Sequence, residues 1–188
     1  MVGAVLVTAA AAGDVARASD APRTDPVVGS FTAKPVNVKT RTCVGQDGGY
    51  FEVSGKFAGD IVSADPRVSG TLEFLAHALV NTTTGFGNFE GTFTISSTAP
   101  GGGARGTFAT VVSGGAFNHG FARGRLGGGE EGQHDGEGGD GGADFFARYE
   151  AVVDGALNVT GAFGGPGHPQ APAIIQSGRC SGRWTRVP

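Results

Sequence analysis

Apolar and polar side chains alternate along most of the chain between residues 36 and 163. The clearest stretch is Val68 to Val80, whose two alternating sets are Val68, Gly70, Leu72, Phe74, Ala76, Ala78 and Val80, and Ser69, Thr71, Glu73, Leu75, His77 and Leu79. A period of two is typical of a β-strand with one buried face. We therefore expect a strand here, with Phe74 at the centre of its core face.

The same alternation predicts eight or nine strands in all. Beside Val68–Val80 they are Val36–Val44, Tyr50–Val62, Gly85–Ser96, Ala104–Val112, Ala116–Leu126, Phe145–Val153, Leu157–Phe163 and Ala173–Ser177. Turn signals rich in Gly and Pro separate them. After residue 18, no stretch shows the sustained period of 3.6 in apolar residues that is typical of a helix. The pattern predicts an all-β fold, a single antiparallel closed barrel of about eight strands, with a β-sandwich as the alternative.

A repeated Gly-x-Phe pattern favours the barrel. It occurs at Gly55/Phe57, Gly87/Phe89, Gly91/Phe93, Gly106/Phe108, Gly115/Phe117 and Gly161/Phe163. Residues two apart on a strand share a face, so each Gly lies beside a Phe on the same side of the sheet. Strongly curved sheets use Gly to bend, and a neighbouring aromatic ring covers the exposed backbone.

The rest of the chain divides into shorter segments outside the predicted strands. Residues 2–13 are apolar and are followed by the cleavage pattern Ala16-Arg17-Ala18, which predicts a signal peptide over 1–18, without the usual basic start. Residues 19–32 are expected to be a flexible linker, 33–182 the barrel domain, and 183–188 a tail. This organisation predicts a secreted protein, extracellular or periplasmic.

Two cysteines, Cys43 and Cys180, lie near the ends of the predicted barrel. Neither belongs to a metal-binding spacing, and an isolated pair in an exported chain most often forms a disulfide. We expect a Cys43–Cys180 bond that ties the first strand to the last.

Charge excludes one class of partner. The 188 residues carry a formal net charge of -3, and Lys and Arg never form a run, so we expect no nucleic-acid binding. No segment approaches the roughly 20 apolar residues of a membrane-spanning helix, so we expect no membrane span. The oligomeric state is left open, and no cofactor is expected.

The stretch Thr84–Phe93 (TGFGNFEGTF) resembles the TGxGxF-centred strand of plant dirigent proteins and allene oxide cyclases. Ser54–Ile61 is similar to their second strand, and Asp65–Leu72 belongs to a layout that resembles exported bacterial barrel proteins. The resemblance implies an eight-stranded antiparallel barrel with a central cavity. It also implies a cyclase, isomerase or stereochemistry-directing activity, but it assigns no catalytic residue.

Five side chains are candidates for chemistry, although the chain contains none of the common catalytic motifs. Glu73 and His77 share the polar face of one strand, where they are either exposed outside the barrel or an acid/base pair in a polar lumen. His119 and Arg123 share a face framed by Phe117 and Phe121, which suits either surface packing or anion recognition at a barrel mouth.

Tyr149 is the fifth candidate, and it shares a face with Phe145, Ala147, Ala151 and Val153. We expect it to be a core residue with a hydrogen-bonded hydroxyl, in preference to a catalytic acid.

The segment 127–144 interrupts the alternation of apolar and polar residues and is expected to be a disordered Gly-rich, acidic loop. Its carboxylates are of the type that Ca²⁺ prefers, although they lack ordered ligand spacing: Glu130, Glu131, Asp135, Glu137, Asp140 and Asp144. Asn81 and Asn158 begin formal N-glycosylation sequons, which matter only in a eukaryotic source.

Three functions are therefore open. The leading hypothesis is a non-enzymatic secreted barrel that binds a small hydrophobic ligand or acts as a structural or interaction module. The first alternative is a cyclase, isomerase or stereochemistry-directing protein that acts on a hydrophobic substrate in the lumen. The second is calcium-dependent adhesion through the acidic loop.

Overall fold

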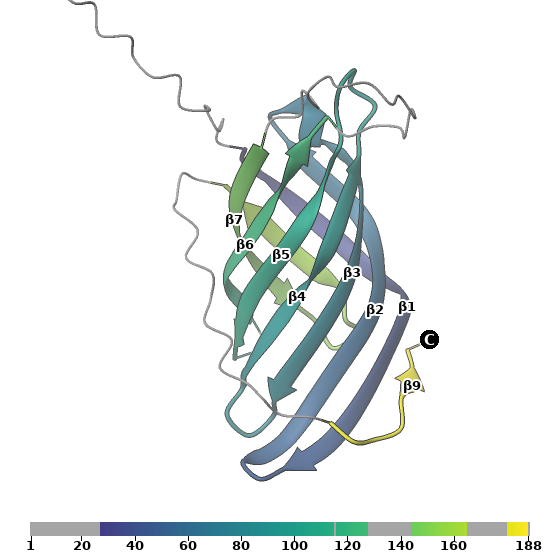
Figure 1. The fold of residues 1–188 in the computed structure, drawn as a ribbon, viewed down its shortest axis with the longest axis vertical. Coiled ribbons are helices and arrows are strands. Elements are labelled where there is room, and N and C mark those ends of the chain that lie inside the picture. The colour runs from purple at the N-terminus through teal and green to yellow at the C-terminus, as the bar shows by residue number, and fades with distance from the viewer. Residues whose placement is uncertain (1–26, 115, 128–143, 165–179, 188) are drawn as a thin grey trace, which may run out of the picture.

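Eight strands form a closed antiparallel barrel (Figure 1), which confirms the predicted fold class and excludes the sandwich. The computed structural model describes residues 27–114, 116–127, 144–164 and 180–187, with the backbone alone for 116–119 and 145. The barrel strands are β1 (Gly29–Gly45), β2 (Gly48–Ser63), β3 (Gly70–Asn81), β4 (Phe86–Ser96), β5 (Ala104–Ser113), β6 (Ala116–Leu126), β7 (Asp144–Val153) and β8 (Val159–Phe163). No helix among the described residues is both long and apolar enough to cross a membrane.

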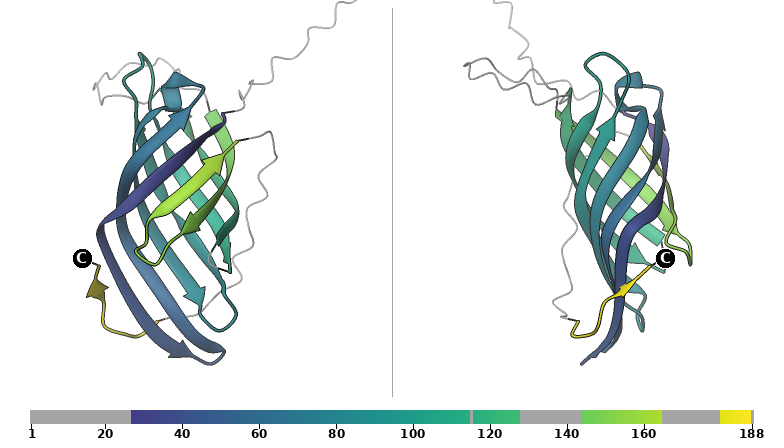
Figure 2. Two further views of the ribbon diagram at one scale, coloured as in Figure 1. Left: turned by 180° about the vertical axis from the view of Figure 1, so that it is seen from behind. Right: turned by 90° about the vertical axis from the view of Figure 1, so that its right-hand side faces the viewer.

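The barrel is an up-and-down arrangement in which each strand pairs with the next, and β1 closes it against β8. The pairing of β1 with β8 covers Gly29 to Ala33, whereas the pairing with β2 runs the full length of β1. The β1–β2 hairpin is therefore longer than the barrel wall and projects beyond it at the lower end (Figure 2).

The projecting part of β1 has a second edge that β8 does not cover. A short strand near the C-terminus, β9 (Thr185–Arg186), pairs with Lys39 and Thr40 along this edge. The Val187 amide also donates a hydrogen bond of 2.9 Å to the Val38 carbonyl. An exposed strand edge offers unpaired backbone groups, and the C-terminal segment covers part of this one. The predicted tail 183–188 therefore contains a strand.

The first strand begins earlier than the sequence pattern indicates. Gly29 to Thr32 belong to β1, although they were expected to be linker, and Val27 just before them is 2% exposed. A β-bulge between Pro35 and Asn37 explains the difference. The extra residue changes which positions face inward, so alternation before the bulge is out of phase with alternation after it. The predicted strand Ala173–Ser177 lies outside the described residues.

The core faces of the other strands agree with the alternation. On β3 the inward positions Leu72, Phe74, Ala76 and Ala78 are buried, whereas Leu75 on the outer face is 58% exposed. A 3-10 turn, η1 (Pro66–Val68), precedes this strand and buries Val68. The described phenylalanines of the Gly-x-Phe pairs are all buried within the barrel: Phe57, Phe89, Phe93, Phe108 and Phe163.

Candidate functional site

Aromatic rings occupy most of the barrel interior. Phe57 and Phe74 stack with their ring centroids 4.9 Å apart, and Phe74 also meets Phe108 edge-on at 5.7 Å. Phe89 lies 5.0 Å from Phe108. An eight-stranded barrel has an interior just wide enough for side chains to fill, and interlocking rings fill it efficiently. The lumen is therefore packed over much of its length.

Small residues on neighbouring strands make room for these rings. A Cβ on Gly91 of β4 would collide with the Leu75 carbonyl and come within 2.8 Å of the Phe108 ring. A Cβ on Gly120 of β6 would collide with the ring of Tyr149, which lies over it. The rings of Phe108 and Tyr149 therefore lie directly against glycine backbone, and a larger residue would not fit at these two positions.

A cavity of about 80 Å³ remains inside the barrel. Side chains from all eight barrel strands line it, together with Val27 and Val68. Among the described residues every lining side chain is a hydrocarbon except that of Tyr149. The surface that these side chains present to the cavity is apolar, which suits a small hydrophobic molecule.

Tyr149 is the one sequence-predicted candidate that lines this cavity. Its side chain meets Phe31 and Phe108 edge-on at 6.1 and 6.4 Å, and the residue is 7% exposed. Burial raises the pKa of the Tyr149 phenol well above its usual range, and the Thr110 hydroxyl offsets this only in part. The hydroxyl oxygen is fully buried, so the ring of Tyr149, and not its hydroxyl, faces the cavity. The expected core position is thus correct, and the Thr110 hydroxyl is the neighbouring hydrogen-bonding group.

Glu73 and His77 both lie on the outer face of β3, and they do not form a pair. Glu73 makes an ion pair of 2.7 Å with Lys56, in which both side chains are largely exposed. His77 instead donates from Nε2 to the Glu52 carboxylate across the β2–β3 ladder, at 2.8 Å. The acid/base pair envisaged for a polar lumen is therefore not formed.

Glu52 is the centre of a cluster that the sequence pattern did not reveal. Its side chain is 9% exposed, and Arg41 Nε donates to it at 2.6 Å from β1, opposite His77. The Arg41 guanidinium lies 4.4 Å from the centre of the Trp184 ring, which belongs to the C-terminal segment. Burial alone would raise the pKa of Glu52, but the hydrogen bonds from Arg41 and His77 outweigh it and lower that pKa.

We expect Glu52→Gln to lower the free energy of unfolding at pH 7 by about 1–2 kcal/mol, since it removes two charge-assisted hydrogen bonds. A carboxyl whose pKa is lower in the folded state stabilises the protein above its unfolded pKa of about 4.3. This contribution is lost as the pH falls through the folded pKa. Urea denaturation of the variant between pH 7 and pH 3 should therefore show a shallower loss of stability in acid.

Glu73→Gln is the matched control, because its carboxylate belongs to an exposed ion pair. It should change stability by no more than about 0.5 kcal/mol at any of these pH values. Equal effects of the two substitutions would mean that the Glu52 cluster has no special role in stability.

Arg123 lies on the outer surface, at a shallow hollow of about 910 Å³ that also includes His77. Small residues on β4 and β5, among them Gly91 and Ala109, line it between larger side chains on β3 and β6. His77 is bonded to Glu52, and Arg123 donates to the Thr107 hydroxyl at 3.4 Å. His77 and Arg123 therefore both have partners on the barrel surface, and Glu90 adds a carboxylate to the lining of the hollow, which distinguishes it from the apolar lumen.

The backbone at His119 departs from the expected alternation. The β6–β7 register shifts between Phe117, which pairs with Ala151, and Gly120, which pairs with Tyr149. The uniform period expected from Phe117 to Arg125 is therefore interrupted at His119, whose side chain lies outside the described residues.

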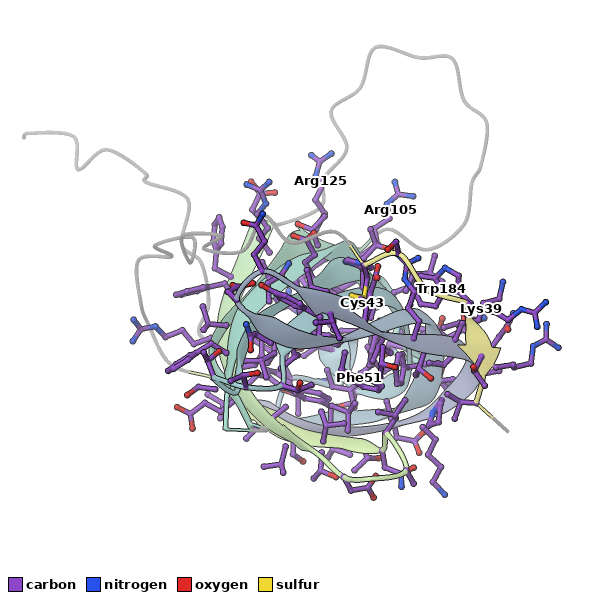
Figure 3. All side chains as sticks on the ribbon, turned by 90° about the horizontal axis from the view of Figure 1, so that it is seen from below. Lys39, Cys43, Phe51, Arg105, Arg125 and Trp184 are labelled. Carbon is purple, nitrogen blue, oxygen red and sulfur yellow. A yellow bond between two sulfur atoms is a disulfide. The ribbon has the colours of Figure 1, made fainter. Side chains whose placement is uncertain are left out.

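The predicted disulfide joins Cys43 and Cys180, whose Cα atoms are 5.4 Å apart. It lies on the outside of the barrel wall: Figure 3 shows Cys43 and Trp184 on one side of the β1–β2 ribbon and Phe51 on the other. The bond holds the C-terminal segment against β1, beside the Glu52 cluster. Strand β8, which closes the barrel against β1, does not contain either cysteine.

Of the acidic-loop candidates, Asp144 is described, at the exposed start of β7. It lies 3.8 Å from Arg125 Nε. The other five candidates lie outside the described residues, within which no cluster of metal-binding side chains occurs. The calcium hypothesis therefore stays a prediction.

The two sequons differ in accessibility. Asn81 is 1% exposed, and its side chain donates to the Asp47 carbonyl and accepts from the amides of Thr83 and Thr84. A glycan on Asn81 would require this structure to open. Asn158 bonds to Asp154 at the surface.

No protein-family model, curated protein or solved structure matches this chain. The function of the lumen is therefore inferred from its geometry and chemistry.

Proposed function

We propose that this protein is a non-enzymatic barrel that binds a small hydrophobic molecule in its lumen. The observation that carries the proposal is the residual cavity, whose described lining presents only apolar surface. Its volume of about 80 Å³ compares with the ~150 Å³ of an apolar cavity that binds benzene. The expected ligand is therefore compact, smaller than a terpenoid or a fatty acid, unless the lumen rings move to admit it.

A cyclase or isomerase acting in the lumen has less support. Such an activity needs polar groups that hold or move protons beside the substrate. Of the five candidates, Glu73, His77 and Arg123 lie on the outer surface, and Tyr149 has a pKa too high for proton release near neutral pH. Ligand binding without catalysis requires none of these groups, and it is the function that we favour.

We further infer that the protein is exported to an oxidising compartment. The Cys43–Cys180 bond supports this inference, because structural disulfides persist outside the reducing cytosol. The signal-peptide pattern of residues 1–18 is an independent argument for the same location.

Small apolar probes should stabilise the folded protein. A ligand that binds only the native state, present at ten times its Kd, adds about 1.4 kcal/mol, which for a chain of this size raises Tm by about 4 °C. Cyclopentane and xenon under pressure are suitable probes, with thermal unfolding followed by circular dichroism.

Ala147→Leu should abolish this stabilisation, since Ala147 lines the cavity and the larger side chain would fill it. Ala162→Leu is the control, because Ala162 lies on the exposed face of β8 and should leave the shift intact. A wild-type protein that no probe stabilises, or an equal shift in Ala147→Leu, would contradict binding in the lumen.

A further inference from the structure

The hollow on the outer surface has a lining that follows from the strand register. Two neighbouring rows of outward-facing residues cross it from β3 to β6, and each residue pairs with the next one in the ladder. The rows are His77, Glu90, Ala109 and Phe121, and Leu75, Thr92, Thr107 and Arg123. The larger side chains on β3 and β6 flank the smaller ones on β5, and the hollow between them spans about 14 Å, since neighbouring strands lie ~4.8 Å apart.

Glu90 is an acceptor in this hollow without a protein partner. The residue is half-buried, and its carboxylate takes part in no hydrogen bond or ion pair with another described residue. His77 lies opposite Glu90 in the ladder, but its Nε2 donates to Glu52. An ionised carboxylate only accepts hydrogen bonds. Glu90 is therefore available to a ligand that donates them.

Arg123 supplies donors on the other side of the hollow. Its Nε donates to the Thr107 hydroxyl at 3.4 Å, and its terminal guanidinium N–H groups have no acceptor among the described residues. The charges of Glu90 and Arg123 cancel, so the lining has no net charge when His77 is neutral. The complementary ligand is neutral and has polar groups that both donate and accept, as hydroxyl groups do.

An exposed aromatic ring lies beside these polar groups. Phe146 of β7 lines the hollow, is 40% exposed, and lies opposite Arg123 in the β6–β7 ladder. The negative face of an aromatic ring attracts weakly positive C–H groups. A sugar ring has C–H groups on its faces and hydroxyl groups at its edge, so it fits an aromatic ring and polar side chains together.

We propose that this hollow is a second binding site, separate from the lumen, and that its ligand is a neutral oligosaccharide. One sugar ring packs against Phe146, and hydroxyl groups of the chain donate to the Glu90 carboxylate and accept from the Arg123 guanidinium. A peptide strand is a poorer fit, because β3 to β6 are each paired on both sides and offer no free edge. An apolar protein surface is also a poorer fit, since it would leave the Glu90 and Arg123 charges desolvated.

The test is an NMR titration of the isotope-labelled protein with cellotriose, maltotriose, xylotriose, mannotriose and N-acetylchitotriose. At least one should shift the backbone amides of Glu90, Thr92 and Thr107 in a saturable way. Glu90→Ala should raise the Kd for that saccharide by about tenfold or more, because hydrogen bonds to a charged acceptor are lost. Phe146→Leu keeps an apolar side chain but removes the ring, and should raise the Kd about three- to tenfold.

Asp60→Ala and Val152→Ala are the matched controls, because both residues are exposed on the outer wall and neither lines the hollow. They should leave the Kd unchanged, and so should Ala147→Leu, which fills the lumen and thereby separates this proposal from the lumen proposal. The proposal is overturned if none of the five saccharides shifts these amides, or if Glu90→Ala and Phe146→Leu bind as the wild type does. Tighter binding of trigalacturonate, which carries carboxylates, would overturn the neutral class of ligand.

Discussion

Phe74→Ala should lower the free energy of unfolding by about 3–5 kcal/mol, as expected for a large aromatic residue removed from a packed core. Phe74 stacks on Phe57 and meets both Phe89 and Phe108 edge-on, so the substitution removes three ring contacts together. The neighbouring strands are fixed by the closed ladder and cannot collapse into the space. Urea denaturation followed by circular dichroism measures the loss.

Leu75→Ala is the matched control, because Leu75 is the next residue on the same strand and faces solvent. Its substitution should change stability by no more than about 0.5 kcal/mol. A larger loss of stability for Leu75→Ala than for Phe74→Ala would show that the inward and outward faces of β3 are assigned the wrong way round.

Removal of the Cys43–Cys180 disulfide should have an effect of similar size. The two cysteines are 137 residues apart, and in the chain-entropy model a closed loop of that length contributes about 5 kcal/mol. The double variant Cys43→Ala with Cys180→Ala should therefore melt well below the wild type. Thermal unfolding with and without reductant checks this, because reductant should lower the Tm of the wild type and leave that of the variant unchanged.

Thiol titration provides the direct control. Protein taken from its native compartment and denatured without reductant should show no free thiol. Two titratable thiols, or a wild-type Tm that reductant does not change, would contradict a stabilising disulfide.

The architecture was largely predictable because a period of two is a local property of the sequence. The inner face of β3 follows directly from alternation over 70–81, and the Gly-x-Phe pairs place glycine and ring on the same face of one strand. Alternation does not indicate which residue of a neighbouring strand each aromatic ring contacts. The Phe108 ring covers Gly91 of β4, and the Phe31 ring covers Gly161 of β8, contacts that depend on register and barrel curvature.

Bulges and pairing register account for the main differences. The bulge between Pro35 and Asn37 changes the phase of β1 and hides its first four residues from a search for alternation. His77 of β3 bonds to Glu52 of the neighbouring strand β2. In the β2–β3 ladder His77 lies opposite Ser54, and Glu52 is two residues from Ser54 on the same face of β2. Local sequence spacing favours Glu73 instead, since it lies on the same strand.

The C-terminal segment shows a further limit. Its two-residue strand β9 has too few positions to display a period, and it forms because the projecting edge of β1 is free. The disulfide was predicted from the cysteine count, but it ties this segment to the outer wall and is not a link between the two strands that close the barrel.

The candidate site was only partly predictable, for a chemical reason. Residue types suited to catalysis pointed to Glu73, His77 and Arg123, all of which lie on the outside of the barrel, where polar side chains are solvated. Tyr149 was recognised as a core residue from its apolar neighbours. That its ring lies over Gly120 of β6 and lines the cavity depends on the pairing register, which local spacing does not contain.

Xenon binding to crystals of the protein tests the lumen site most directly, because xenon occupies accessible apolar cavities without needing a specific polar contact. Diffraction from a pressurised crystal should show xenon inside the barrel, among Phe74, Phe108 and Tyr149, in the wild type and not in Ala147→Leu. A lumen without xenon in the wild type, with the rings closed over the cavity, would contradict the proposal that this barrel binds a small hydrophobic molecule.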